Sequence, residues 1–268
     1  MIIIGEKING TLESTRSAIG KRDADAIAAM ALSQVEAGAD YLDINVATIE
    51  GGRDYELDAM AWALEVVKGV TDKPVALDSS DPAVLQKGLE LCDDPRTFIN
   101  SVTGETGFLE GVLPLAARHG CHVVALAMDE SGIPGTAEGR VSICRKILDR
   151  ARGLGIPESN IYFDPLVLPV STDCNQARLT LDTLASIKSE LPDCKSVLGL
   201  SNVSFGLPLR PKLNQAFLSM CVFLGLDAVL LDPSDVGLRT ALFASLTIAG
   251  MDGFCSGYIK AYRQGMLG

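Results

Sequence analysis

The sequence has 268 residues and a formal net charge of −11, from 23 basic and 34 acidic residues. A chain this acidic lacks the clustered Lys and Arg that binding to nucleic-acid phosphates requires, so no nucleic-acid partner is expected. With 47% hydrophobic residues, only 5% aromatic residues and 26 Gly, the composition indicates an aliphatic core with many tight turns and excludes a disordered chain.

Neither export nor membrane insertion is predicted. No stretch approaches the roughly 18 uninterrupted apolar residues of a membrane-spanning helix, and the opening MIIIGEKING has neither a basic region nor a long apolar run. The seven Cys are scattered without a Cys-x-x-Cys pair, which is typical of reduced thiols. We therefore expect a cytoplasmic protein that does not associate with a membrane.

Short apolar runs alternate with segments of helical periodicity along the whole chain. Each run is brief and apolar, as expected of parallel strands that are buried on both faces. We predict eight such strands, in chain order Ile2–Ile4, Tyr41–Asn45, Val75–Asp78, Thr97–Asn100, His122–Met128, Ile161–Asp164, Ser196–Gly199 and Ala228–Leu231.

The segments between these runs have the apolar spacing of amphipathic helices. After the third strand, Asp81 supplies an N-cap and Pro82 stands at the first helical position. The apolar stripes are Ile27, Met30, Ala31 and Val35, then Val84, Leu85, Gly88 and Leu89, and finally Leu238, Leu242 and Leu246. Eight strands, each followed by a helix or helical turn, fit an α/β fold with a single domain, a (β/α)8 TIM barrel over residues 1–268.

An open, doubly wound sheet is the alternative fold. Such a sheet normally has a Gly-rich dinucleotide-binding turn after its first strand, whereas this chain has GEKINGT in place of GxGxxG. His119 and His122 are candidate metal ligands. A turn between a helix and a strand explains the two His residues more simply, because a metal site needs three or four convergent ligands.

Polar residues follow the end of every predicted strand. In a barrel the carboxyl ends of the strands converge on one mouth, where active sites are built. Any one of these residues could be a helix cap or a turn former, but capping alone would also tolerate Ser, Thr or Gly at many of the positions. The set is Glu6, Asn9, Asp43, Asn45, Asp78, Asn100, Asp129, Asp164, Ser201, Asn202 and Asp232.

Carboxylates and carboxamides dominate this set. It offers no strand-end Lys for a Schiff base and no His for proton relay, and no Gly-rich phosphate site follows the last two strands. Carboxylates accept hydrogen bonds, and Asn both donates and accepts them. The ring therefore suits a flat, neutral, donor-rich heterocycle, and a Mg²⁺ site built from the same carboxylates is the alternative.

Several motifs make the sequence resemble the pterin-binding methyltransferase family, and most closely the methyltetrahydrofolate:corrinoid-protein methyltransferases of anaerobic bacteria. In the family's order they are GEKING (5–10), LDINV (42–46), LDSS (77–80), INS (99–101), MDESGIP (128–134), DPLVLP (164–169) and LGLSNVS (198–204). The combination of GEKING, DPLVLP and LGLSNVS is specific to the family. Dihydropteroate synthase shares the barrel more distantly, and its Ser-Phe-Ser-Asp loop is absent here.

The resemblance implies a pterin bound at the barrel mouth. By match to the family, Asn202 lies at N5, the atom that carries the methyl group, and is the catalytic residue. The substrate-binding set that the resemblance implies is Asp78, Asn100 and Asp164 hydrogen-bonded to the pterin, Gly199 and Ser201 close to its ring, Met128 packed near it, and Arg210 and Glu6 beside the site. No metal of the enzyme's own is implied.

The implied activity moves a methyl group between the cobalt of a corrinoid and N5 of tetrahydrofolate. No Asp-x-His-x-x-Gly motif is present to bind cobalt, so we expect cobalamin on a separate corrinoid protein that docks at the barrel mouth. The family also implies a homodimer.

The physiological role has several alternatives. Phe205 stands where the corrinoid/iron–sulfur-protein enzymes have a polar Gln, which favours methyl delivery to tetrahydrofolate in an O-demethylase or glycine betaine demethylation system. The alternatives are transfer from methyltetrahydrofolate to the corrinoid/iron–sulfur protein of acetyl-CoA synthesis, a non-catalytic folate-binding module, and a Mg²⁺-dependent lyase.

Overall fold

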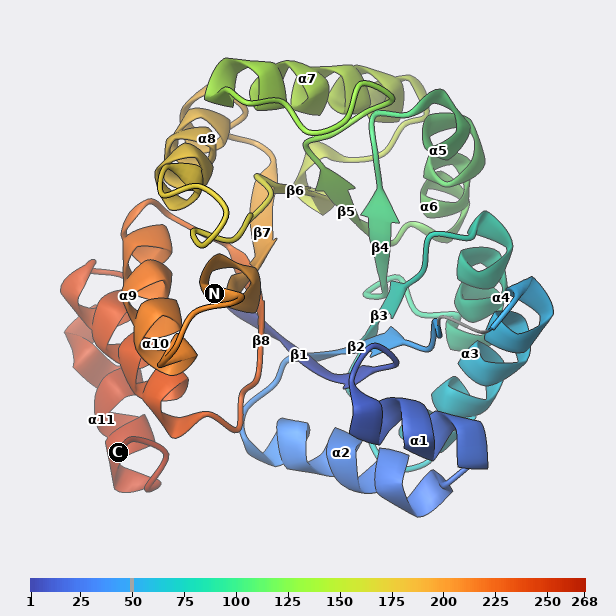
Figure 1. Ribbon diagram of the computed structural model, residues 1–268, viewed down its shortest axis with the longest axis horizontal. Helices are drawn as coiled ribbons and strands as arrows, with labels where there is room; N and C mark the ends of the chain where they lie inside the picture. Colours follow the sequence, from blue (N-terminus) through green and yellow to red (C-terminus); the bar gives the residue numbers. More distant parts are fainter. Residues whose placement is uncertain (49–50) are drawn as a thin grey trace.

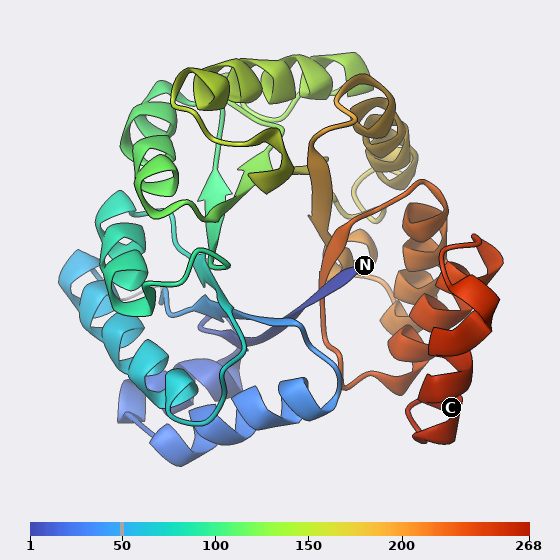
Figure 2. The same cartoon turned by 180° about the vertical axis from the view of Figure 1, so that it is seen from behind.

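Eight parallel strands close into a barrel in the computed structural model, and helices surround the barrel on its outside (Figure 1 and Figure 2). The strands follow one another in sequence order, and β1 pairs with β8 to close the barrel. The structure describes residues 1–48 and 51–268. This architecture confirms the predicted (β/α)8 barrel.

Strands and helices alternate along the chain, with additional helices after β1, β4 and β8. The strands are β1 (Ile2–Asn9), β2 (Tyr41–Asn45), β3 (Val75–Asp78), β4 (Phe98–Val102), β5 (His122–Leu126), β6 (Ile161–Asp164), β7 (Lys195–Gly199) and β8 (Ala228–Leu231). The helices are α1 (Glu13–Lys21), α2 (Ala24–Glu36), α3 (Arg53–Lys68), α4 (Pro82–Cys92), α5 (Thr106–Gly111), α6 (Leu113–His119), α7 (Ala137–Gly153), α8 (Gln176–Glu190), α9 (Arg210–Phe223), α10 (Val236–Ile248) and α11 (Ser256–Arg263). Short 3-10 turns are η1 (Glu158–Asn160), η2 (Leu200–Ser204) and η3 (Gly253–Cys255).

The inside of the barrel is filled by side chains. The cluster is Ile4, Ala76, Phe98, Val124, Tyr162, Val197 and Ala228. The ring of His122 lies 4.8 Å from that of Phe98, centroid to centroid, and burial lowers the pKa of this imidazole. His122 therefore belongs to the packed core, and within the described ranges no group of three or more His, Cys, Asp or Glu is placed to hold a metal ion.

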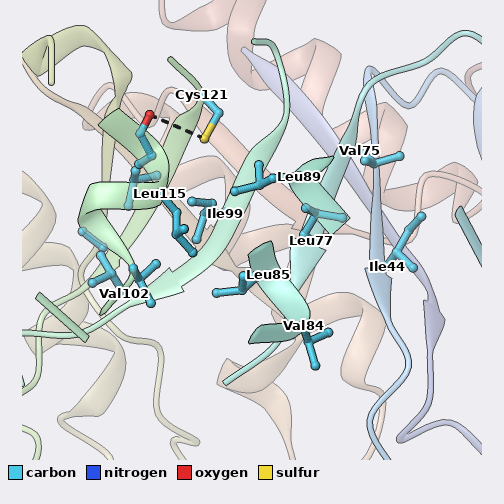
Figure 3. Packing of buried hydrophobic residues seen from close by; sticks show 14 of the residues in the cluster. Ile44, Val75, Leu77, Val84, Leu85, Leu89, Ile99, Val102, Leu115 and Cys121 are labelled. Atoms are coloured by element: carbon cyan, nitrogen blue, oxygen red, sulfur yellow. Dashed lines mark hydrogen bonds between the residues drawn. The ribbon is translucent and has the colours of Figure 1, made fainter. Parts of the chain in front are cut away.

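A second apolar layer lies between the strands and the helices (Figure 3). Helix α4 shows why the sequence produces this packing. Asp81 Oδ1 accepts a hydrogen bond from the N–H of Ala83 at 2.9 Å, and Pro82 occupies the first helical position, as predicted. At Gly88 the helix approaches β3 so closely that a Cβ atom would lie 2.8 Å from Cδ1 of Leu77.

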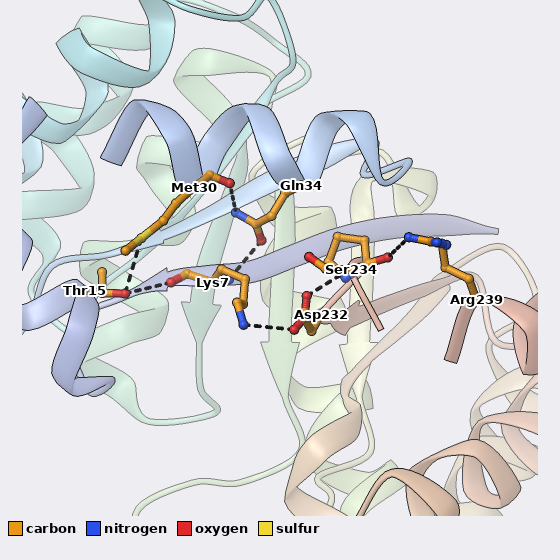
Figure 4. Close-up of polar contacts among 8 residues, drawn as sticks. Lys7, Thr15, Met30, Gln34, Asp232, Ser234 and Arg239 are labelled. Atoms are coloured by element: carbon orange, nitrogen blue, oxygen red, sulfur yellow. Dashed lines mark hydrogen bonds and ion pairs between the residues drawn. The ribbon is translucent and has the colours of Figure 1, made fainter. Parts of the chain in front are cut away.

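The first strand differs from its prediction. It continues past Ile4 to Asn9, because a bulge carries the pairing with β2 over the charged residues of this segment. The bulge leaves the backbone of Lys7 without strand partners. Gln34 Oε1 accepts from its N–H at 2.9 Å, and Thr15 Oγ1 donates to its carbonyl oxygen at 2.9 Å (Figure 4).

Nowhere in the described ranges does a helix reach the length and hydropathy that spanning a bilayer requires.

Candidate active site at the barrel mouth

The carboxyl ends of the strands meet at a cavity of about 490 Å³. It is lined by Glu6, Lys7, Asn9, Thr11, Leu12, Asp43, Asp78, Gly199, Ser201, Asn202, Arg210, Pro211, Asn214, Leu230 and Asp232. Six of the nine residues expected at the site are therefore in the lining. The other three, Asn100, Met128 and Asp164, are outside it, on β4, in the loop after β5 and at the end of β6.

Strand register explains why polar side chains form a ring here. Asn9, Asn45, Asp78 and Asn100 occupy paired positions across β1 to β4, and such neighbours point to the same face of a sheet. Asn45 Nδ2 donates to Asp78 Oδ2 at 2.8 Å, and Asn100 Nδ2 donates to Asp43 Oδ1 at 3.0 Å. Each amide thereby orients one carboxylate.

Four carboxylates at the mouth have raised pKa values, whereas hydrogen bonds from Lys7 and Ser234 lower that of Asp232 against the effect of burial. Burial raises the pKa of Asp78 to about 6 and that of Asp164 to about 7. Burial and the nearby Asp78 carboxylate raise the pKa of Asp43 well above its ordinary value, and burial together with Asp232 raises the pKa of Glu6. Because a buried ionised carboxylate is costly unless paired, these groups favour a ligand that presents N–H donors.

The turn after β7 carries the predicted catalytic residue. β7 ends at Gly199, and Asn202 is exposed in the 3-10 turn η2, with its Nδ2 placed 3.5 Å from where a Cβ on Gly199 would lie. Arg210 holds this turn, because its Nη2 donates to the carbonyl oxygen of Ser201 at 2.7 Å and its Nε donates to Ser204 Oγ at 3.1 Å. Arg210 thus fixes the backbone that presents Asn202.

Met128 lies in a loop, because β5 ends at Leu126 and not at the predicted Met128. The carbonyl oxygen of Met128 accepts from the N–H of Gly104 at 2.8 Å, which joins the loops after β4 and β5. Asp164, at the end of β6, accepts from the N–H of Leu166 at 2.7 Å.

Sequence reasoning missed Lys7 and Asn214 at the mouth, and it placed Asp43 there without giving it a binding role. The expectation that the ring has no strand-end Lys is wrong, because β1 extends to Asn9 and places Lys7 Nζ at the mouth, 2.9 Å from Asp232 Oδ2 (Figure 4). Asp43 is 1% exposed. Asn214 is 7% exposed, and its Oδ1 has no hydrogen-bond partner in the described residues. Its position, one helical turn after Arg210 and so on the same face, was the available signal.

Comparison of the sequence with known families and proteins identifies similar chains. Residues 5–232 match the family described as pterin binding enzyme. The chain is 35% identical over 270 residues to a methylcorrinoid:tetrahydrofolate methyltransferase of Eubacterium limosum, covering 100% of this chain and 98% of that protein. It is 34% identical over 249 residues to methionine synthase of Mycobacterium tuberculosis, covering 88% of this chain and 21% of that longer protein.

Solved structures show the same barrel. A Yersinia pestis dihydropteroate synthase with a sulfonamide drug complex superposes with a TM-score of 0.70 at 15% identity, covering 93% of this chain and 94% of that one. A second structure from this organism, with a pterine–sulfa conjugate, gives a TM-score of 0.69 at 16% identity, covering 93% of each chain. At this identity the likeness shows the fold alone.

Proposed function

The chain belongs to the family of pterin-binding enzymes, and from this premise we propose that it is a methyltransferase acting between a corrinoid and tetrahydrofolate. The observation that carries the proposal is the full-length likeness to a methylcorrinoid:tetrahydrofolate methyltransferase, together with a barrel mouth whose lining includes four carboxylates.

Binding of the pterin follows from the charge of the mouth. The pyrimidine edge of a pterin presents N–H donors, and Asp78, Asn100 and Asp164 supply acceptors on neighbouring parts of the rim. Asp78 and Asp164 have pKa values raised by burial, so hydrogen bonds to their ionised forms relieve a cost that the empty site carries. Gly199, Ser201, Met128, Glu6 and Arg210 complete the proposed set around the ring.

Catalysis requires positive charge at N5 during transfer. When N5 of tetrahydrofolate attacks the methyl carbon, the carbon–cobalt bond breaks with its electron pair left on cobalt, and N5 then gives its proton to water. Asn202 has no carboxyl group to act as an acid. It instead supplies a hydrogen bond that is stronger in the transition state than in the ground state, and Arg210 keeps its turn in place.

We propose that the methyl group moves from a methylcorrinoid protein to tetrahydrofolate, in an O-demethylase or glycine betaine demethylation system. The apolar side chain of Phe205 and the name of the full-length relative favour this direction. Phe205 and Leu209 are 63% and 78% exposed beside the mouth, which suits docking of the corrinoid protein there. The test is to compare the rate of methyl transfer to tetrahydrofolate from the methylcorrinoid protein of a demethylation system with the rate from a methylated corrinoid/iron–sulfur protein.

A homodimer and a cytoplasmic location are part of the same proposal. Helices α9 and α10 pack side by side, and together with η3 and α11 they expose large apolar side chains, which mark interaction sites when they gather in one patch. These side chains are Met220, Phe223, Ile248, Phe254 and Tyr262. Sedimentation of the purified protein as a monomer at micromolar concentration would reject the dimer.

The test of the activity is methyl transfer from methylcobalamin to tetrahydrofolate. We expect turnover by the wild type and a loss of about 10²–10³-fold in Asn202→Ala, with little change in tetrahydrofolate affinity. Asn160→Ala is the control and should keep wild-type turnover, because Asn160 lies in η1 just before the start of β6, at the opposite end of that strand from the mouth. Near wild-type turnover in Asn202→Ala would remove Asn202 from catalysis.

The same assay separates the rival functions. Tetrahydrofolate binding without any methyl transfer by the wild type would favour a non-catalytic folate-binding module. Activity that EDTA abolishes would favour a Mg²⁺-dependent enzyme.

A further inference from the structure

Arg140, in the first turns of α7, is a buried charge that the mechanism so far does not use. It is 1% exposed and is the largest fully buried side chain in the described residues. Taking a guanidinium out of water is costly unless its N–H groups find partners. The partners of Arg140 in the described ranges are backbone carbonyl oxygens.

These carbonyls belong to two loops at the barrel mouth. Arg140 Nε donates to the carbonyl oxygen of Pro134 at 3.1 Å, in the loop after β5. Its Nη1 donates to the carbonyl oxygens of Pro165 and Leu166, at 2.6 and 2.8 Å, in the loop after β6. One side chain thus fixes the backbone that directly follows Asp164.

Leu166 connects this backbone to the Asp164 carboxylate. Its φ of +66° lies in the left-handed region, which is unfavourable for a non-Gly residue. Its carbonyl oxygen accepts from Arg140 and from Thr180 Oγ1 at 2.9 Å, and its N–H donates to Asp164 Oδ1 at 2.7 Å. The partners on its carbonyl side therefore hold the N–H that orients the carboxylate.

We propose that Arg140 is a positioning residue for folate binding, which fixes the 164–166 turn so that the Asp164 carboxylate faces the pterin. The inference rests on the proposed function, in which Asp164 binds that ring. Arg140 also acts through charge, because it lowers the pKa of Asp164 against the larger effect of burial. Cys144, also on α7, interacts with Asp164, and burial raises the pKa of its thiol and keeps it neutral.

Calorimetric titration with tetrahydrofolate across pH 5.5–8.5 tests the role. In Arg140→Met we expect about tenfold weaker binding, as when a residue that orients a ligating side chain is lost. We also expect the midpoint of the pH dependence of affinity to shift upward, because Arg140 no longer lowers the pKa of Asp164. Arg140→Lys keeps the charge but not the fork of donors, so it should lose affinity with a nearly unchanged midpoint. Arg150→Met, an exposed change on the same helix, should alter neither.

A double-mutant cycle separates positioning from a general structural effect. If Arg140 acts through Asp164, adding Arg140→Met to Asp164→Asn should change affinity by less than about twofold, because the carboxylate that it orients is already gone. A role confined to stability would lower the melting temperature and weaken binding equally in both backgrounds.

Either of two results would overturn the inference. One is a folded Arg140→Met variant whose tetrahydrofolate affinity and pH dependence of affinity match those of the wild type. The other is a double-mutant cycle in which the losses of affinity from Arg140→Met and Asp164→Asn are additive. If Arg140→Met does not fold, Arg140→Lys decides, and wild-type affinity in that variant rejects the role. Failure of the wild type to bind tetrahydrofolate would instead contradict the proposed function itself.

Discussion

At the scale of single residues, the central feature is the Asp78 carboxylate, which is hydrogen-bonded to another side chain of the protein and which we expect to bind the substrate. Asp78 accepts from Asn45 at 2.8 Å and lines the cavity. We expect Asp78→Ala to weaken tetrahydrofolate binding by about 1–3 kcal/mol, as for loss of a charged hydrogen-bond partner. Isothermal titration calorimetry measures the change, with the exposed Asp54→Ala as control. Unchanged affinity would place Asp78 outside the site.

Protonation of the same carboxylates should make binding depend on pH. Asp164 and Asp78 have pKa values of about 7 and about 6, and only their ionised forms accept hydrogen bonds with both oxygens. Tetrahydrofolate affinity should therefore fall as pH decreases from 8 to 5.5, by up to about tenfold per pH unit for each proton taken up. A flat affinity profile over this range would contradict an ionised Asp164 as a ligand.

Residue types at strand ends could be read from the sequence, and residues placed by helix packing could not. Asn45, Asp78 and Asn100 follow short apolar runs, so their convergence follows from the barrel alone. Asn214 lies one helical turn after Arg210 in α9, but this spacing alone does not show that the shared face of the helix meets the mouth. Its unpartnered Oδ1 becomes visible only in three dimensions.

At the scale of secondary-structure elements, two glycines make a matched pair. Gly88 in α4 has no room for a Cβ beside Leu77, whereas Gly107 in α5 has no atom within 4 Å of the same position. Gly88→Ala should lower the free energy of unfolding by about 1–3 kcal/mol through overpacking. Gly107→Ala should raise it by about 0.4–1 kcal/mol, because Ala reduces the entropy of the unfolded chain.

Urea denaturation of both variants measures these changes. Stabilisation in Gly88→Ala would show that Leu77 moves aside at no cost and that the close approach of α4 to β3 does not constrain residue 88.

Element boundaries were less predictable than element types. The apolar run predicts the start of β1, but Glu6 and Lys7 interrupt it, and a strand with two charged residues at its end resembles a loop. The strand continues because side chains of α1 and α2 satisfy the backbone of its bulge. Such long-range partners have no local signature, so the lysine at the mouth was missed.

At the scale of the whole molecule, the ligand-free site should reduce stability above neutral pH. Asp164, Asp78 and Asp43 have pKa values raised by burial. Between its unfolded and folded pKa, each group binds more protons in the folded than in the unfolded state, so acidification stabilises the fold. We expect the melting temperature of the ligand-free protein to rise as pH falls from 8 to 6.5.

Differential scanning calorimetry checks this expectation. The range stops at 6.5 because burial lowers the pKa of His122, and this group opposes the trend at lower pH. An unchanged or falling melting temperature would mean that ionisation of the three carboxylates costs the fold little.

The barrel itself could be predicted because alternating strands and helices leave few other ways to bury every apolar run. The parallel register that aligns Asn45, Asp78 and Asn100 then follows from the same geometry, whereas Asn9 is paired with Asn45 only through the bulge in β1. The sequence does not predict which exposed apolar side chains contact a partner. Phe205 and Phe223 are both exposed, and only the folded structure shows which part of the surface each one occupies.

The ion pair between Lys7 and Asp232 joins residues that are 225 positions apart in the chain. Contacts between residues so far apart in the sequence are among the slowest for a folding polypeptide to form, because a long loop must close first. Because β8 follows the other strands in the chain and closes the barrel against β1, we expect the rim of the mouth to stay open during synthesis until β8 has left the ribosome. We expect chains truncated before β8 to bind no tetrahydrofolate, so that ligand binding to a nascent chain reports the moment at which the barrel closes.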